Sequence, residues 1–302
     1  METASSQTTT PQVGTLFQGF WSGRDLSLIN RACLRSFIAA GHTFDLYSYD
    51  TLSVPDGVSL RNAAEIVPRS ELFLFDNPNT GRPDVAPFAD YFRLRLLANR
   101  GGWYCDVDTV CLSSTVPTRG RIWAQAAPEF ERGTIGNGEI HFDVDDPLCR
   151  VLLERAEAAR DRIERRETLG PVLFSSVIAE RGLPRASGAS TPVLYPIRWV
   201  EVFKLWLPEF LEEVERRLAG AWFLPVYQSF PQYLQLDETL LPPDGSYLRN
   251  LISTFASDPG GPAHDPRAIR EATRRWLIAN NGWAIPWLYS ISGPQSLAKL
   301  IG

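Results

Sequence analysis

Hydrophobic spacing predicts alternating strands and helices in the first part of the chain. An apolar run over 15–21 predicts a first strand, and apolar residues at helical spacing over 25–40 predict a helix that Gly41 closes. Residues 44–49 form a second apolar run and predict a second strand. A strand–helix–strand opening favours a parallel α/β sheet, in which ligands bind beyond the carboxyl ends of the strands.

The clearest pattern lies between residues 86 and 112. A helix is predicted to start at Pro87, whose missing N–H suits a first helical position, and to end at Gly101-Gly102. Its apolar face is predicted to contain Val85, Phe88, Ala89, Phe92 and Leu96. The aromatic and β-branched segment 103–112 then predicts one continuous buried strand.

Beyond this segment the pattern predicts further elements. Strands are expected over 121–127 and 191–196, and helices over 147–166, 172–181, 207–218 and 266–280. No repeat, linker or domain boundary is visible, so a single domain over 14–302 is expected, with a helical acceptor or lid region over about 200–302. The polar, Ser/Thr-rich residues 1–13 predict a disordered tail.

Composition narrows the function classes. The 302 residues are 44% hydrophobic and 22% charged, as in an ordinary globular protein, and the net charge of −5 argues against a nucleic-acid binder. Lys204 and Lys299 are the only lysines, so any mechanism that needs a catalytic lysine has two candidates.

The cysteines and the hydropathy of the chain indicate the cellular compartment in which the protein is expected. Four cysteines without a Cys-x-x-Cys pair and only three histidines argue against a structural zinc site, and the thiols are expected to be reduced and buried. No window supplies the roughly 20 apolar residues of a membrane span. A cytoplasmic protein is expected, while a secreted effector and peripheral membrane contact stay open.

Two aspartates interrupt the apolar segment 103–112. Strand alternation predicts Asp106 and Asp108 on the same side. Two neighbouring carboxylates are costly to bury unless a cation or hydrogen bonds compensate them. Mg²⁺ or Mn²⁺ together with a phosphate group would do so, because both metals prefer hard oxygen ligands.

The surroundings of these aspartates resemble a known family. An Asp-x-x-Arg helix (Asp90, Arg93), then Gly-Gly-x-Tyr, then Asp-x-Asp resembles the nucleotide-sugar site of glycosyltransferase family 32, whose DXD region is shared with the large clostridial glucosylating toxins. The resemblance implies a GT-A type α/β fold with a mostly parallel central sheet and additional C-terminal helices. It also implies a metal-dependent retaining transferase that moves a hexose from a nucleotide-sugar to an acceptor hydroxyl.

The resemblance assigns roles to five residues of this segment. It implies that Asp106 binds the ribose and approaches the metal, and that Asp108 ligates the metal directly. Asp90 and Arg93 are implied as sugar and phosphate contacts, since they are neighbours on one helix face. Tyr104 matches the family's tyrosine two residues before the motif; a core aromatic is the alternative.

Further donor contacts follow from weaker matches. Trp21 resembles the toxins' tryptophan that stacks on uracil, so a UDP-sugar is favoured and a GDP-sugar remains open. Asp50 is a candidate for hydrogen bonding to base or ribose. Asn137, in a Gly-Asn-Gly loop, is a candidate contact to the donor sugar or acceptor, or a turn residue. The segment 168–171 resembles the family's Thr-Gly-Pro segment with one inserted residue, or is a helix cap.

One family feature is missing. The C-terminal His-Leu-Trp segment that usually closes the site is not found, and 246–250 lies at the corresponding distance without a histidine. Asn250, Asp258 and His264 are therefore candidates for a further metal or phosphate contact.

Two other functions fit part of the pattern. Asp106-Val107-Asp108-Thr109-Val110 also fits a haloacid-dehalogenase-type phosphatase, in which the first aspartate attacks phosphorus. A catalytically inactive relative that binds a nucleotide or a partner is the second alternative. The acceptor stays open between a glycan, a lipid-linked glycan, a natural product and a protein, and the aromatic segment 276–289 between an acceptor cleft, a lid and a membrane-surface patch.

Overall fold

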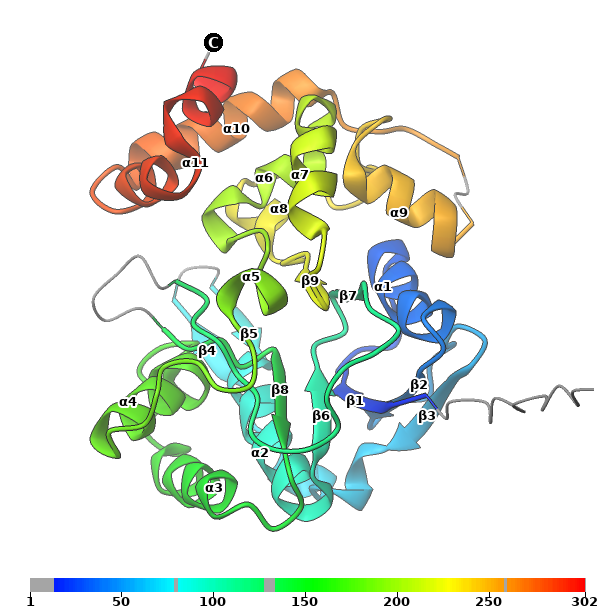
Figure 1. The fold of residues 1–302 in the computed structure, drawn as a ribbon. Coiled ribbons are helices and arrows are strands. Elements are labelled where there is room, and N and C mark those ends of the chain that lie inside the picture. Colours follow the sequence, from blue (N-terminus) through cyan, green and yellow to red (C-terminus); the bar gives the residue numbers. More distant parts are fainter. Residues whose placement is uncertain (1–13, 79–80, 128–133, 258–259, 302) are drawn as a thin grey trace, which may run out of the picture.

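The computed structural model describes residues 14–78, 81–127, 134–257 and 260–301 (Figure 1). Its central sheet has the order β3-β2-β1-β6-β8. The strands are β1 (Leu16–Phe20), β2 (Thr43–Ser48), β3 (Val58–Asn62), β6 (Gly102–Cys105) and β8 (Glu139–Phe142). All neighbours pair in parallel except β8, which is antiparallel to β6. The predicted α/β class with a mostly parallel sheet is confirmed; the predicted tail over 1–13 lies outside the described residues.

Helices cover both faces of this sheet. α1 (Leu28–Ala39) packs on one face, where Phe37 meets Phe17 and Phe44. α2 (Ala86–Arg100) covers the other face, where its Phe92 stacks on Phe20. α3 (Pro147–Ala159) and α4 (Leu173–Glu180) join the same hydrophobic cluster as α2. Successive side chains of β1 point to opposite faces of the sheet, and helices cover both faces. This short apolar strand is therefore buried on both sides.

The start and end of α2 follow from its sequence. Pro87 occupies the first turn, and the side chain of Asp84 accepts the N–H of Ala86 just before it. Gly101 ends the helix in the left-handed region, with φ of 61°, which glycine adopts at little cost. The short connection to β6 therefore fixes the helix relative to the strand that precedes the two aspartates.

The C-terminal part is helical and has its own hydrophobic core. It contains α5 (Thr191–Leu194), α6 (Phe203–Trp206), α7 (Leu211–Leu218), α8 (Phe230–Tyr233), α9 (Tyr247–Phe255), α10 (Pro266–Ala279) and α11 (Ala284–Ile301). Figure 1 shows these helices gathered beyond one end of the sheet. β7 (Thr109–Cys111) pairs with β9 (Phe223–Pro225) and connects this part to the sheet.

A charged cluster is buried inside the C-terminal part. Lys204 Nζ lies 2.8 Å from Glu201 Oε1 and 2.7 Å from Glu213 Oε1, and both Lys204 and Glu201 have fully buried side chains. Arg217 also contacts Glu201, and Ser292 connects the cluster to α11. Because each buried charge has a partner, removing one would leave another uncompensated.

The structure corrects several predicted elements. The expected single strand over 103–112 is broken, because β7 leaves the central sheet to pair with β9. Segment 191–196 forms helix α5 rather than a strand, and 121–127 makes only isolated bridges. The helix expected over 147–166 ends at Ala159, and the one over 207–218 begins with a 3₁₀ turn. The remaining predicted helices form close to their expected bounds.

The cysteines match the prediction, since all four are free and buried. Among the described residues, no helix combines the length and apolar character needed to cross a membrane.

Candidate active site

Asp106 and Asp108 lie in the turn between β6 and β7. The N–H of Thr109 donates to the carbonyl of Asp106 at 3.1 Å, which closes the turn. The N–H of Asp106 donates to the carbonyl of Gly138 at 3.0 Å, which fastens the turn to the loop before β8. The prediction that the two aspartates are alternate residues of one strand is therefore wrong. A turn at the carboxyl end of a central parallel strand brings them together.

Arg93 links α2 to this turn. Its Nη1 lies 2.9 Å from Asp90 Oδ1, and its Nη2 lies 2.6 Å from Asp106 Oδ1. The Arg93 side chain is 4% exposed, whereas that of Asp106 is 38% exposed. A buried fork thus holds an accessible carboxylate, which is the geometry for which arginine is suited.

Asn137 and Tyr104 complete this network. Asn137 Nδ2 donates to Asp90 Oδ1 at 2.7 Å. The guanidinium carbon of Arg93 lies 4.5 Å from the centre of the Tyr104 ring, a cation–π contact. The structure therefore brings together five of the predicted site residues: Tyr104, Asp90, Arg93, Asp106 and Asn137.

The electrostatics of Asp90 and Arg93 follow from their burial. Burial raises the pKa of Asp90 to about 6, although Arg93 and Asn137 act in the opposite direction. Burial also opposes the charge on Arg93, but Asp106 and Tyr104 outweigh it and raise its pKa. Arg93 is therefore a permanent cation between the two carboxylates.

Two glycines allow the loops to approach these carboxylates. A Cβ atom at Gly170 would lie 2.3 Å from Asp90 Oδ2, and one at Gly138 would lie 2.9 Å from Asp106 Oδ2. Gly170 belongs to the one-turn π-helix Thr168–Val172, which corresponds to the predicted Thr-Gly-Pro-like segment. That segment covers Asp90 only because residue 170 has no side chain.

Asp108 is held from the opposite side by the C-terminal part. The backbone N–H of Gln228 donates to Asp108 Oδ2 at 2.9 Å, and that of Val226 donates to the Asp108 carbonyl at 2.9 Å. The Gln228 side chain in turn donates to Ser27 at 2.7 Å. Burial first and the charge of Asp106 second raise the pKa of Asp108 to about 6, because like charges lie close together.

These carboxylates fit a divalent cation that is shared with a ligand. Among the described residues no group of three or more His, Cys, Asp or Glu side chains is arranged to hold a metal. Mg²⁺ is commonly bound through one or two carboxylates together with substrate phosphates and water. One carboxylate oxygen of each aspartate is engaged by Arg93 or Gln228, so each keeps a second oxygen for a cation.

Trp21 and Asp50 lie at the same edge of the sheet. Trp21 directly follows β1, and its N–H donates to the Tyr47 carbonyl on β2 at 2.9 Å. Within the described residues the buried Trp21 Nε1 has no hydrogen-bond partner. Asp50 follows β2 and pairs with Arg69 at 3.2 Å, so it lies two strands from the aspartate turn.

The other predicted contacts lie elsewhere. Asn250 is exposed on α9, which packs on α1, and within the described residues no contact joins its side chain to the aspartates. His264 is buried in the C-terminal part, where its Nε2 lies 3.0 Å from the Asp237 carbonyl. Asp258 lies outside the described residues.

Three further residues join the site that the sequence did not indicate. Gln228 contacts Asp108, as described above. Glu139 is buried behind the turn, where its Oε1 accepts the Thr109 hydroxyl at 2.5 Å. Burial first and Asp106 second raise the pKa of Glu139 to about 8. Glu139 follows the Gly-Asn-Gly loop directly, which is the one signal in the sequence that could have found it.

Arg166 is the third of these residues. Its Nε lies 2.9 Å from Asp84 Oδ2, and its side chain is 35% exposed. Burial raises the pKa of both Asp90 and Asp108, and the charge of Arg166 acts against this rise at both carboxyl groups. Arg166 lies two residues before the π-helix that covers Asp90, so the loop that brings Gly170 to the site also brings a cation.

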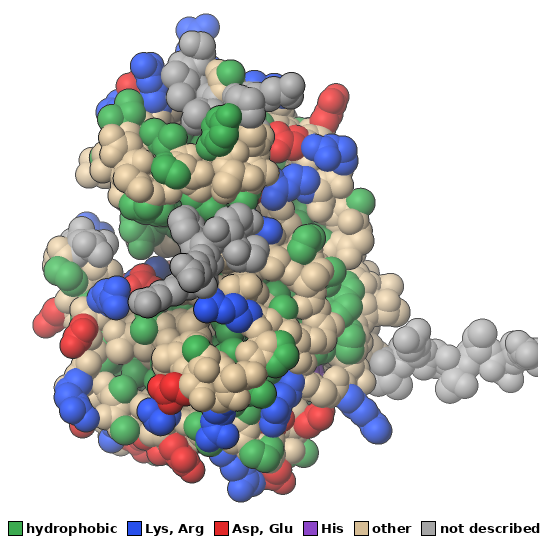
Figure 2. Space-filling view, turned by 60° about the vertical axis from the view of Figure 1, so that its left-hand side comes forward, with side chains coloured by type: hydrophobic (Ala, Val, Ile, Leu, Met, Phe, Trp, Pro, Cys, Tyr) green, Lys and Arg blue, Asp and Glu red, His purple; other side chains and the backbone are tan. Residues whose placement is uncertain are grey.

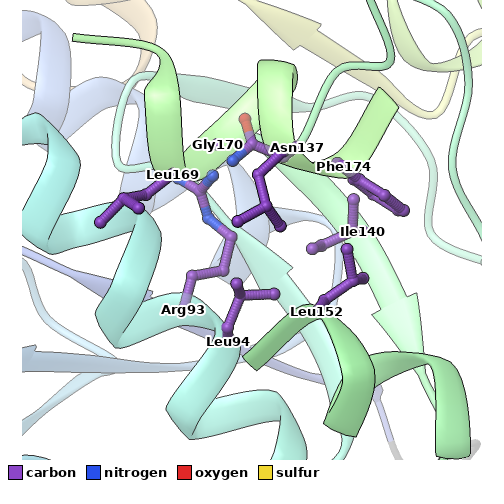
Figure 3. A pocket seen from close by; sticks show the side chains of 9 residues that line it. Arg93, Leu94, Asn137, Ile140, Leu152, Leu169, Gly170 and Phe174 are labelled. Atoms are coloured by element: carbon purple, nitrogen blue, oxygen red, sulfur yellow. The ribbon is translucent and has the colours of Figure 1, made fainter. Parts of the chain in front are cut away.

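A small cavity lies behind Arg93 (Figure 3). It is lined by Arg93, Leu94, Asn137, Ile140, Leu152, Leu169, Gly170, Leu173 and Phe174. Its lining is mostly apolar and it lies on the buried side of the guanidinium. It is too small for a sugar or a nucleotide, so it belongs to the packing behind the site.

The family comparison fits this geometry. Residues 46–126 match the model of the glycosyltransferase sugar-binding region containing DXD motif. This segment is therefore similar to the sugar-binding region of DXD-type glycosyltransferases. The match includes β6, α2 and the aspartate turn, and it confirms the predicted family resemblance and the enzyme class, a glycosyltransferase.

Solved structures show a similar but distant chain path. The PaToxG glycosyltransferase is 15% identical, with 56% of this chain and 70% of that chain covered and a TM-score of 0.41. The WbbM bifunctional glycosyltransferase in its apo form is 12% identical, with 87% and 52% covered and a TM-score of 0.44. The chain thus spans about half of the WbbM chain. No curated protein matches the sequence significantly.

Proposed function

We propose that this glycosyltransferase is metal-dependent and transfers a hexose, with retention of configuration, from a nucleotide-sugar to an acceptor hydroxyl. A UDP-sugar is the favoured donor. The observation that carries the proposal is the chain of contacts from Asp90 through Arg93 to Asp106. It supports a turn whose carboxylates are pre-positioned, at the edge of the sheet where α/β proteins bind ligands.

The donor is bound by residues on five segments. Trp21, which follows β1 at the same edge of the sheet, offers an indole face for the base, and the second oxygen of Asp106 is shared between the ribose and the cation. Asp90 and Asn137 lie where hydroxyl groups of the sugar can be bound. Arg166, whose side chain is 35% exposed, provides a cation for the diphosphate. Asp106 and Asp108 would hold Mn²⁺ or Mg²⁺, which when bound neutralises charge on the departing diphosphate.

The chemistry breaks one bond and forms another. The bond between the anomeric carbon and the diphosphate oxygen breaks, and its electron pair leaves with the nucleoside diphosphate. A bond forms between the anomeric carbon and the acceptor oxygen, whose proton passes to the departing phosphate. The protein's part is positioning and electrostatic stabilisation, since Arg93 and Arg166 supply fixed positive charge where negative charge develops.

The phosphatase alternative is less well supported. It requires a lysine near the aspartates, but Lys204 is buried in ion pairs with Glu201 and Glu213, and Lys299 lies on α11. It also requires a later acidic pair, and Asp146 instead caps α3 and pairs with Arg121. The inactive-relative alternative rests only on the missing C-terminal His-Leu-Trp segment.

A donor panel tests the proposal. UDP-, GDP- and other nucleotide-sugars of glucose, galactose, mannose and N-acetylglucosamine are incubated with enzyme and Mn²⁺, and release of the nucleoside diphosphate is measured. We expect metal-dependent release from one class of donor, and its loss in Asp108→Asn. Release of phosphate from a simple phosphomonoester instead, or no release from any donor, would contradict the proposal.

A further inference from the structure

We propose that a group of partly exposed aromatic side chains in the C-terminal part binds a sugar ring of the acceptor, so that the acceptor is a saccharide. The group, here called the aromatic wall, consists of Trp199, Tyr233, Trp276 and Trp283. The inference rests on the proposed function, because it names the substrate class that the same site would glycosylate.

The four rings of the aromatic wall pack against one another. The Trp199 ring lies 5.4 Å from Tyr233 and 5.1 Å from Trp276, both close to edge-on, and 6.1 Å from Trp283 in a stacked arrangement. Trp276 and Trp283 are also 5.5 Å apart. Tyr233 is 37% and Trp283 40% exposed. Rings that hold one another in place present a rigid surface, which costs little conformational entropy on binding.

The aromatic wall is continuous with the aspartate turn. Gln228 bonds to Asp108, and helix α8 starts two residues later at Phe230 and ends at Tyr233. Tyr233 is therefore carried by the short helix that directly follows the residue bonded to Asp108.

The surface view agrees with this placement. Figure 2 shows hydrophobic side chains along the lower edge of the upper, C-terminal part, above a hollow that contains acidic and basic side chains. A ligand that reaches the charged floor of this hollow would pass along the hydrophobic edge. Concave sites that combine apolar walls with a few polar groups are typical of small-molecule binding.

The chemistry of the wall favours a sugar ring over a lipid surface. A pyranose has an apolar C–H face that fits a flat aromatic ring, and hydroxyl groups that need polar partners at the rim. The exposed amides of Gln232, Gln235 and Asn281 lie beside Tyr233 and Trp283 in the sequence and can provide them. Exposed Asp237 and Glu238 follow α8, and their charge would repel anionic lipid head groups.

Direct binding tests the inference without requiring turnover. An array of oligosaccharides of glucose, galactose, mannose, rhamnose and N-acetylglucosamine is probed with the full chain in the absence of donor, and the Kd of the strongest binder is measured by calorimetry. We expect Trp283→Ala and Tyr233→Ala to weaken that Kd about tenfold, in line with the contribution of a well-packed aromatic contact, and Trp283→Phe to recover part of it.

The matched control is Tyr289→Ala. Tyr289 is 55% exposed on α11, close to Trp283 in sequence, and is not part of the aromatic wall. We expect it to bind the same oligosaccharide as the unmodified chain. An equal loss in Tyr289→Ala, or no oligosaccharide retained by the unmodified chain, would overturn the inference.

Two further measurements distinguish a failure of this inference from a failure of the proposed function. With a working donor, the ratio of sugar transfer to donor hydrolysis is expected to fall about tenfold in Trp283→Ala. If no donor is turned over, the proposed function fails, but the array result still shows whether the aromatic wall binds a saccharide. Cosedimentation with phosphatidylcholine–phosphatidylglycerol vesicles that is lost in Trp283→Ala would overturn the saccharide assignment in favour of a lipid surface.

Discussion

Arg93 Nη2 lies 2.6 Å from Asp106 Oδ1, and this contact joins the helix before the aspartate turn to the turn itself. The same guanidinium holds Asp90 at 2.9 Å, so two carboxylates that would repel each other share one buried cation. The contact uses one oxygen of Asp106 and leaves the more exposed carboxylate surface for a ligand. The site is therefore organised before any donor or metal arrives.

Arg93→Lys should disable the site although it keeps the charge. A lysine ammonium is a point charge and cannot hold Asp90 and Asp106 with a planar fork. We expect donor turnover (kcat/KM) to fall about tenfold or more, and the unfolding midpoint to drop, since a buried pair is disturbed. Arg95→Lys is the control, because Arg95 lies on the same helix but pairs with Glu157 at the partly exposed side. Equal turnover in both variants would remove Arg93 from the site.

Asp108→Asn should abolish turnover without unfolding the protein. The amide keeps the shape of the side chain and an oxygen that accepts the Gln228 N–H. It removes one of two neighbouring like charges, so thermal stability should be unchanged or higher. Loss of a charged ligand should lower metal-dependent turnover about a hundredfold or more. Asp161→Asn, at a 91% exposed side chain, serves as the control; turnover is then compared at saturating Mn²⁺.

Chelation should have the same effect on the unmodified enzyme. Incubation with EDTA followed by desalting should remove donor turnover, and Mn²⁺ or Mg²⁺ should restore it, because two carboxylates alone hold such a cation reversibly. Isothermal titration of the apo protein with Mn²⁺ measures the site directly. We expect affinity to increase when the nucleoside diphosphate is present, since phosphate oxygens complete the coordination. Full turnover after chelation would contradict the metal assignment.

Local patterns predicted the parts of the fold that depend on local physics. The strand–helix–strand opening and α2 formed close to their expected bounds, because helical spacing, Pro87 and Gly101 act within a few residues. The break after Cys105 was not visible, since it depends on β7 pairing with β9, a contact between segments that are far apart in sequence. The β-branched residues of segment 191–196 favour a strand, but Pro192 starts a helical turn there.

In the site, too, local sequence predicted some residues, whereas others depend on tertiary contacts. Asp90 and Arg93 could be paired from their spacing of three, and Asn137 was placed from the resemblance. Arg166 and Gln228 could not be found, since each is brought to the site only by tertiary contacts, with Asp84 and Asp108 respectively. Asn250 and His264 were chosen by their distance along the chain, which carries no information about position in space.

Gly170→Ala should damage the site by steric pressure alone. The added methyl group would lie 2.3 Å from Asp90 Oδ2, so Asp90 or the π-helix must move. Overpacking of this kind costs roughly 1–3 kcal/mol, and turnover should fall because Asp90 also orients Arg93. Gly282→Ala is the control, because a Cβ at that position meets open space. Denaturant unfolding and donor hydrolysis of both variants check this; unchanged turnover in Gly170→Ala would place Asp90 outside the donor site.

Because of the buried charges of the C-terminal part, the stability of the protein should decrease at low pH. Burial opposes ionisation of Glu201, but Arg217 and Lys204 outweigh it and lower its pKa to about 2. A carboxyl group with a lowered folded-state pKa stabilises the protein above its unfolded pKa of about 4.5, and this stabilisation is lost as the pH falls toward 2. Its full size is about 3 kcal/mol.

Comparison with Glu201→Gln isolates this contribution. At pH 7 the unmodified chain should be more stable than the variant, in which Lys204 and Arg217 lose their shared carboxylate. The difference in unfolding free energy should shrink between pH 4.5 and pH 3, because only the unmodified chain titrates at this position. Urea unfolding at both pH values measures it, with Lys299→Met as a control for loss of a lysine outside the cluster. A difference that is the same at pH 7 and pH 3 would mean that Glu201 stabilises the fold by packing and not by charge.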